Sequence, residues 1–296
     1  MRAAGYRLDV IYPADDPHTA LLSGAAGALR LTRPGATPLP SGLPDFEPDF
    51  VLTRAGGEAG EGRAGMMYRD LIPGRLGGRY IASHIAIPDG GPVADWVHYH
   101  RIAVQMIAVR KGWVRVVYQD QGEPFVMEQG DIVLQPPGIR HRVLESSSGL
   151  EVVEITAPAL HETFADHELG LPNGRQEARL YGEQRFLFHR TSETPWTPFN
   201  GAEAQETGMS EATGGLAEVR TIRPGSAREI EFSGADGELV FGFVLDGTAR
   251  LHRGDGADLA PADSFVIPPA ELWAIGAMSK DFRLLHITTA RLDGAA

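Results

Sequence analysis

Short runs of strand-favouring residues, separated by glycines at nearly regular intervals, constrain the fold of this chain most. Such runs cover residues 80–87, 113–118, 131–135 and 150–156. In the first run, isoleucines recur on one face, as expected of a half-buried strand. The dividing glycines are Gly112, Gly122, Gly130 and Gly138. A series of short strands with turn signals predicts an all-β barrel or sandwich.

The second half of the chain repeats the first. Residues 284–288 (LLHIT) echo residues 152–156 (VVEIT), and residues 267–269 (IPP) echo residues 135–137 (QPP). Gly247 follows an apolar run much as Gly112 does. The matches occur in the same order and lie about 130 residues apart, which indicates a duplicated domain.

Two segments lack this pattern of short strand-favouring runs separated by glycines. Residues 1–62 contain closely spaced prolines and a glycine-rich stretch, which predicts an N-terminal arm or lid and not an independent domain. Residues 158–204 are mixed in character, and we expect a linker that contains a short helix over residues 160–169.

Composition and charge exclude several classes of function. The formal net charge is −12 and no basic run is present, so nucleic acid is a poor partner. With no cysteine, the chain offers no disulfide or thiolate chemistry. No apolar block resembles a signal peptide or reaches the ~20 residues needed to cross a membrane. We therefore expect a cytoplasmic protein without membrane contact.

A pair of histidines, His98 and His100, gives the first indication of chemistry. Side chains two residues apart on a strand point to the same face, so both imidazoles can reach one ion. A third imidazole, His141, comes from a different segment. Imidazole nitrogens suit zinc, iron, copper and nickel, and the pattern predicts a transition-metal site.

These residues resemble the two motifs of the cupin superfamily. The first motif matches at His98, His100 and Gly112, with Gln105 at the position of its acidic residue, although the leading Gly91 lies one residue further away than usual. The second motif matches at Gly130, Pro136, Gly138 and His141. The resemblance implies a bicupin, with two double-stranded β-helix (jelly-roll) barrels. Cupin domain 1 would cover residues 63–157, and cupin domain 2 would cover residues 205–292.

Gln105 departs from the usual motif, which has a glutamate at this position. The resemblance implies a turn over residues 101–104 that lets the amide oxygen of Gln105 face the ion as a fourth ligand. A neutral amide would leave the metal with its full charge, which favours anionic or enolisable oxygen ligands. The second motif also departs, because Glu145 replaces the asparagine that often ends it.

The second repeat has lost the metal motif. Aligned on the second motif, Trp273 takes the place of His141, and no alignment of the first motif restores a histidine. We therefore expect one divalent transition metal ion per chain, bound in domain 1. Iron is favoured, with manganese, nickel or zinc as alternatives.

Three further residues are candidates for the pocket. Ile107 and Val109 follow Gln105 on the same strand face and predict an apolar wall. Trp96 shares the parity of His98, so it either lines the barrel mouth or packs in the core. Glu145 is a candidate general base, but a surface carboxylate is the better interpretation, and no catalytic residue is assigned.

The sequence leaves three functions open. By analogy with similar bicupins, the first is a metal-dependent dioxygenase acting on a small organic substrate. The second is an isomerase or lyase that uses the metal as a Lewis acid. The third is a non-catalytic small-molecule sensor or storage protein. In each case we expect a homodimer, since jelly-roll barrels often bury a sheet edge by pairing.

Overall fold

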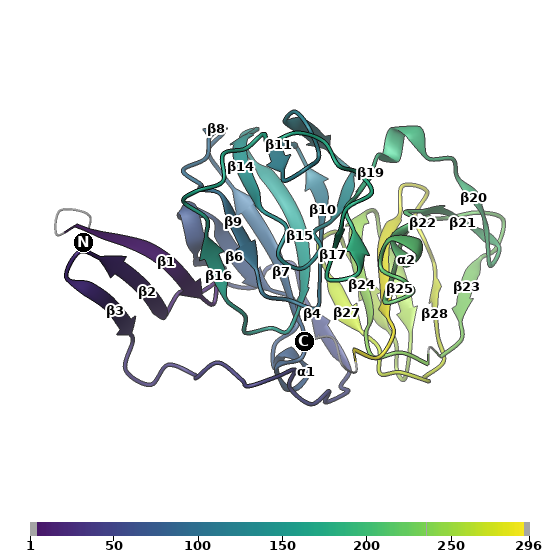
Figure 1. The fold of residues 1–296 in the computed structure, drawn as a ribbon. Helices are drawn as coiled ribbons and strands as arrows, with labels where there is room; N and C mark the ends of the chain where they lie inside the picture. The colour runs from purple at the N-terminus through teal and green to yellow at the C-terminus, as the bar shows by residue number, and fades with distance from the viewer. Residues whose placement is uncertain (1–4, 235, 293–296) are drawn as a thin grey trace.

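The computed structural model describes residues 5–234 and 236–292, and nearly all of its regular structure is β-sheet (Figure 1). Four large sheets form two pairs that lie side by side (Figure 1). The prediction of an all-β jelly-roll fold is confirmed.

The first sheet pair spans most of the N-terminal half of the chain. Its nine-stranded sheet has the order β12 (Phe125–Glu128), β11 (Trp113–Tyr118), β14 (His141–Ser146), β9 (His98–His100), β16 (Thr163–Ala165), β1 (Tyr6–Tyr12), β2 (Thr19–Gly24) and β3 (Gly27–Thr32), with β8 (Gly91–Pro92) paired to β14. The facing seven-stranded sheet has the order β19 (Leu187–His189), β13 (Ile132–Leu134), β10 (Val104–Lys111), β15 (Leu150–Ala157), β7 (Ile81–Ile87), β6 (Met67–Asp70) and β5 (Gly60–Glu61).

The second sheet pair follows a related plan. Its seven-stranded sheet has the order β20 (Thr197–Phe199), β21 (Ala202–Glu206), β22 (Ala217–Arg223), β29 (Arg283–Thr289), β24 (Val240–Asp246), β27 (Ser264–Val266) and β4 (Val51–Thr53). Its four-stranded sheet has the order β23 (Glu229–Phe232), β28 (Trp273–Gly276), β25 (Ala249–His252) and β26 (Ala257–Leu259).

The remaining elements are short. Strands β17 (Leu180–Tyr181) and β18 (Gln184–Arg185) form a separate hairpin. The helical turns are η2 (Arg63–Gly65), α1 (Arg75–Gly78), η3 (Thr191–Glu193) and α2 (Met209–Ala212). No helix in residues 5–234 and 236–292 is long and apolar enough to cross a membrane.

The internal repeat of the sequence appears as a repeated strand order. The order β13–β10–β15–β7 of the first pair recurs as β27–β24–β29–β22 in the second. The pairing register shifts after Val109 in β10 and after Val244 in β24, at equivalent places. The glycines that follow, Gly112 and Gly247, both have positive φ, at 78° and 69°.

Strand β10 is buried on both faces because the two sheet pairs pack against each other. Val104, Met106 and Ala108 belong to a core cluster that also contains Phe241 and Phe243 of the second pair. The alternate side chains of β10 point to the interior of the first pair. A strand buried on both faces is expected to be almost continuously apolar, and residues 104–109 of β10 are apolar except for Gln105.

The flanking segments contain more regular structure than the sequence predicted, and the prediction of a short helix in them is wrong. The arm, residues 1–62, has regular structure: β1–β3 extend the first sheet (Figure 1), and β4 joins the second pair. Its first four residues lie outside the described residues. Residues 160–169 contain strand β16 and no helix, because β9 and β1 pair with it on either side. The expected linker, residues 158–204, also supplies β19 and β20 to the large sheets.

A buried ion pair joins the two sheet pairs and gives a test of their packing. Arg79 donates hydrogen bonds from Nε and Nη2 to the Glu238 carboxylate at 2.9 and 2.6 Å, and the Tyr80 hydroxyl donates to it at 3.0 Å. The Arg79 and Glu238 side chains are 7% and 6% exposed. Removing one charge from such a pair leaves the other charge buried without its partner, which destabilises the fold.

We predict that Glu238→Gln lowers the free energy of unfolding by about 3 kcal/mol. The control is Asp16→Asn, which breaks an exposed ion pair with Arg33 and should cost less than about 1 kcal/mol. Urea unfolding measures both. Equal effects of the two substitutions would contradict this view of the interface.

Candidate metal centre

Three histidines meet on the inner face of the first sheet. His98 and His100 stand at the two ends of β9, and antiparallel pairing with β14 places His141 opposite His98. The ring centroids of His98 and His141 are 4.2 Å apart, and those of the other two pairs are 5.2 and 5.3 Å apart. One nitrogen from each ring lies within 4.8 Å of the others, and all three residues are buried. The sequence-predicted imidazoles therefore converge.

Backbone carbonyls orient two of the rings. The Nδ1 atoms of His98 and His141 lie 2.8 and 3.1 Å from the carbonyl oxygens of Trp96 and Ile139. A proton assigned to Nδ1 leaves Nε2 as the free ligand atom. The Nε2 atom of His98 is buried and has no hydrogen-bond partner in the described part of the chain. Such an orphaned nitrogen fits a metal ligand.

The environment keeps the imidazoles neutral. Burial is the largest cause, and it lowers the pKa of His98 and His100 well below the usual value. Burial likewise lowers the pKa of His141 to about 4. The neighbouring Arg63 charge acts in the same direction on all three pKa values. Neutral imidazole is the form that binds a metal ion, so the site needs no proton loss at neutral pH.

Gln105 lies close by but its amide oxygen has another partner. The side chain is buried, and Oε1 accepts a hydrogen bond of 3.0 Å from Nε2 of Gln135. Oε1 of Gln135 in turn accepts from the Tyr118 hydroxyl. The structure thus places the predicted ligand atom in a side-chain network and does not show it among the imidazoles. Coordination by Gln105 stays a prediction.

The three candidate pocket residues have different positions. Ile107 lines the pocket beside the histidines, as predicted. Val109 lies on the same strand face but is fully buried in the core of the first sheet pair, beyond the pocket. Trp96 instead lines a groove against the arm, because regular strand β9 begins only at His98 and strand parity does not apply at position 96. Glu145 pairs with Arg115 and is partly exposed, as expected of a surface carboxylate.

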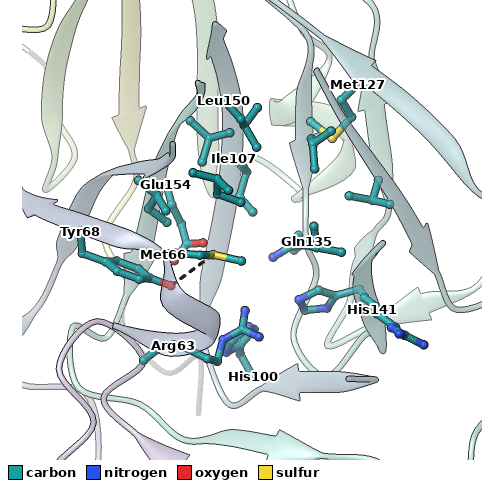
Figure 2. A pocket seen from close by; sticks show the side chains of 18 of the residues that line it. Arg63, Met66, Tyr68, His100, Ile107, Met127, Gln135, His141, Leu150 and Glu154 are labelled. Atoms are coloured by element: carbon teal, nitrogen blue, oxygen red, sulfur yellow. Dashed lines mark hydrogen bonds between the residues drawn. The ribbon is translucent and has the colours of Figure 1, made fainter. Parts of the chain in front are cut away.

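His100 and His141 stand at one end of a largely apolar cavity between the two sheets (Figure 2). Its volume of about 70 Å³ is several times what one water molecule needs. The apolar wall includes Ile85, Ile107, Val114, Val116, Leu150 and Val152. Such a cavity suits a small organic molecule.

Glu154 is a functional candidate that the sequence analysis missed. It lies on β15 opposite Ile107 and lines the same cavity (Figure 2). Burial raises the pKa of its carboxyl to about 7, although Arg63 and Gln105 act in the opposite direction. The signal was present in the sequence, because Glu154 has the strand parity of the apolar Leu150 and Val152.

Arg63 is the second missed residue, and no pattern in the sequence indicates it. It belongs to the turn η2, which precedes β6, and it lines the cavity near His100 (Figure 2). Its guanidinium forms a buried ion pair with Asp95, whose other carboxylate oxygen accepts from the Val143 backbone N–H at 2.9 Å. The cavity therefore contains a fixed positive charge beside the three neutral rings.

Comparison with known proteins identifies solved structures with a similar fold. No family model and no curated protein matches the chain. Among solved structures, it resembles a Bacillus subtilis oxalate decarboxylase mutant with a TM-score of 0.55 and 13% identity, over 86% of this chain and 78% of that one. It also resembles a putative glyoxylate-induced protein of Pseudomonas aeruginosa, with a TM-score of 0.57 and 11% identity, over 86% and 94%.

Protein Ylba from E. coli is similar to the same degree, with a TM-score of 0.57 and 11% identity over 84% of this chain and 95% of that one. At such identities the likeness shows the fold alone. The chain thus shares the jelly-roll fold of these proteins. Its first sheet pair carries a three-histidine cluster suited to a divalent metal ion.

The pKa of Glu154 predicts a specific pH dependence of stability. Since its folded-state value of about 7 lies above the usual 4.5, the folded chain binds more protons than the unfolded chain between these values. Stability contributed by the neutral carboxyl is therefore lost as pH rises through this window. Glu154→Gln should become more stable relative to wild type by up to about 3 kcal/mol between pH 5 and pH 8.

Urea unfolding of chelator-treated protein at both pH values tests this prediction. Glu151→Gln on the same strand is the control. Although partial burial alone would raise it, Arg110 holds the pKa of Glu151 below its usual value, so this carboxyl stays ionised throughout the range. Its substitution should shift stability equally at pH 5 and pH 8. If the free energy of unfolding of Glu154→Gln also differs from that of wild type by the same amount at pH 5 and pH 8, the raised pKa of Glu154 is refuted.

Proposed function

We propose that this protein is a metal-dependent enzyme that acts on a small organic substrate in the cavity of the first sheet pair. The observation that carries the proposal is the convergence of three buried, neutral imidazoles, two of which line a cavity that also holds Glu154. Three protein ligands leave coordination positions for a substrate, as in catalytic metal sites.

His98, His100 and His141 would hold one divalent transition metal ion per chain. They are the one group with this geometry in residues 5–234 and 236–292. Iron is the metal that the sequence favours, and manganese, nickel and zinc are the alternatives. A Bacillus subtilis oxalate decarboxylase with Mn(II) centres is also similar in structure, with a TM-score of 0.53 and 12% identity. This similarity supports including manganese in any reconstitution.

Lewis-acid chemistry is the reaction type that the residues support best. When bound, the metal would polarise a substrate oxygen and stabilise negative charge developing there. Glu154 supplies the matching proton-transfer group, because a carboxyl with a pKa of about 7 can accept or release a proton at neutral pH. Isomerisation or lyase chemistry beside a carbonyl needs these two functions together.

A dioxygenase, the reaction favoured by the sequence resemblance, is the second candidate. The apolar wall of the cavity supports it, since an apolar pocket suits both molecular oxygen and an aromatic or ketonic substrate. In this case the metal would be iron. A protein that binds its ligand without turnover is the remaining alternative.

Oxalate, which the names of the similar decarboxylases specify, is a poor match for this cavity. It is a small dianion without an apolar part, whereas most of the wall here is apolar. Burying that surface against a ligand is favourable only if the ligand has apolar surface of its own. We therefore propose a different substrate.

We also propose that the two sheet pairs are two cupin modules, of which only the first binds metal. At the position that corresponds to His141, the second module has Trp273, which stacks on Phe232 with ring centroids 3.9 Å apart. A packed aromatic pair fills the space that a site would need. The homodimer and the cytoplasmic location stay predictions.

The metal content of purified, untagged protein tests the proposal. We expect about one transition metal ion per chain in the wild type and a loss of most of it in His98→Ala, because two imidazoles bind far more weakly than three. His252→Ala, which changes a partly exposed histidine of the second pair, is the control. Wild-type protein without bound metal, or full metal occupancy in His98→Ala, would contradict the proposal.

Turnover with and without oxygen separates the two reaction types. For Lewis-acid chemistry we expect anaerobic turnover of an enolisable substrate and a loss of at least about 100-fold in kcat for Glu154→Gln. Stoichiometric oxygen uptake and no anaerobic turnover would instead establish the dioxygenase. Ligand binding without turnover under either condition would exclude both.

A further inference from the structure

The cavity is polar at one end and apolar at the other. His100, His141, Arg63 and Gln135 gather at one end, while Leu150 and Met127 lie toward the other (Figure 2). A ligand that fills it must therefore be amphiphilic, with its polar atoms near the histidines. This division is independent of the reaction that the site performs.

Arg63 is the charged group best placed to select the polar part of the ligand. Its side chain is 9% exposed. In the described residues, Nη1 alone of its three nitrogens has a hydrogen-bond partner, which is Asp95. The Nε atom is buried and has none. A guanidinium with an unused donor in a cavity wall is suited to a planar anion, because its N–H groups match two oxygens at once.

The balance of charge around the cavity also favours an anion. Two arginines, Arg63 and Arg142, and one carboxyl, Glu154, are among the side chains that line it. Asp95 accepts a hydrogen bond from Nη1 of Arg63, and the buried Nε donor has no partner in the described residues. A bound divalent metal would leave the polar end positive, so a neutral or cationic ligand would fit less well.

We propose that the cavity binds a small monocarboxylate with a short apolar tail. Arg63 would bind the carboxylate, and the tail would lie among Ile107, Leu150 and Val152. This inference rests on the proposed function, because it takes the cavity to be the substrate site. It assigns to Arg63 the role of a specificity-determining residue, separate from proton transfer by Glu154.

Ligand binding tests this inference without any assay of activity. The probes are 4-methyl-2-oxopentanoate, its primary amide, pyruvate and oxalate, measured by calorimetry on metal-loaded protein. We expect the branched oxo acid to bind at least about tenfold more tightly than each of the other three. The amide lacks the charge, pyruvate lacks the tail, and oxalate adds a second charge that the apolar end does not solvate.

The matched variants remove one positive and one negative charge each. Arg63→Gln/Asp95→Asn abolishes the buried pair without leaving Asp95 unpaired, and it should remove the preference for the acid over the amide. Arg115→Gln/Glu145→Gln changes an exposed pair on the same sheet, with atoms 3.3 Å apart, and should retain that preference. If the first double variant does not fold, Arg63→Lys should still weaken binding of the acid at least about fivefold.

Equal binding of acid and amide to the wild type would overturn the inference, as would an unchanged preference in the folded Arg63 variant. The same titrations on metal-free protein separate this failure from failure of the proposed function. Arg63 should confer part of the preference for the acid even without metal. A protein that binds no metal but prefers the acid would disprove the proposed metal-dependent function and support the role of Arg63.

Discussion

The antiparallel pairing of β9 with β14 is the interaction on which the rest of the site depends. It sets His98 opposite His141, and the strand alternation within β9 adds His100. On the outer face, Tyr99 stacks on Phe164 of β16, with ring centroids 4.9 Å apart, and lies under the Arg140 guanidinium. A strand of three residues is thus held on both edges and on its outer face, so the three rings are positioned before any ligand binds.

The pocket in turn depends on packing between the sheet pairs. Alternate residues of β10 face the cavity and the second pair. The same strand therefore forms part of the cavity wall and part of the core between the two sheet pairs. The second pair, whose described residues hold no histidine cluster, thus covers the outer face of the sheet that carries Glu154. Burial in the apolar wall raises the pKa of the Glu154 carboxyl. Arg63, from a separate turn, adds a positive charge that would suit the proposed carboxylate substrate.

The sequence predicted the features of the fold and the site that depend on local periodicity. The parity of His98 and His100, the spacing of the second motif and the regular glycines indicated both the fold and the three-ring cluster. It failed where long-range pairing decides the outcome. Residues 160–169 form a strand because β9 and β1 flank them, and Trp96 faces the arm because regular pairing starts two residues later. Gln135, which donates to the Gln105 oxygen, comes from a distant segment, so no local sequence pattern predicts this contact. No local pattern predicts the position of Arg63 either.

The extended X-ray absorption fine structure of the bound metal tests the central claim most directly. Imidazole rings produce a multiple-scattering pattern from which the number of coordinated rings is determined. We expect three imidazoles at about 2.0–2.2 Å, with only oxygen or nitrogen scatterers in the remaining positions. Comparison with a Gln105→Ala variant shows whether the amide adds one of these. A spectrum with fewer than two imidazoles, or one unchanged in His141→Ala, would contradict the metal centre derived from the β9–β14 pairing.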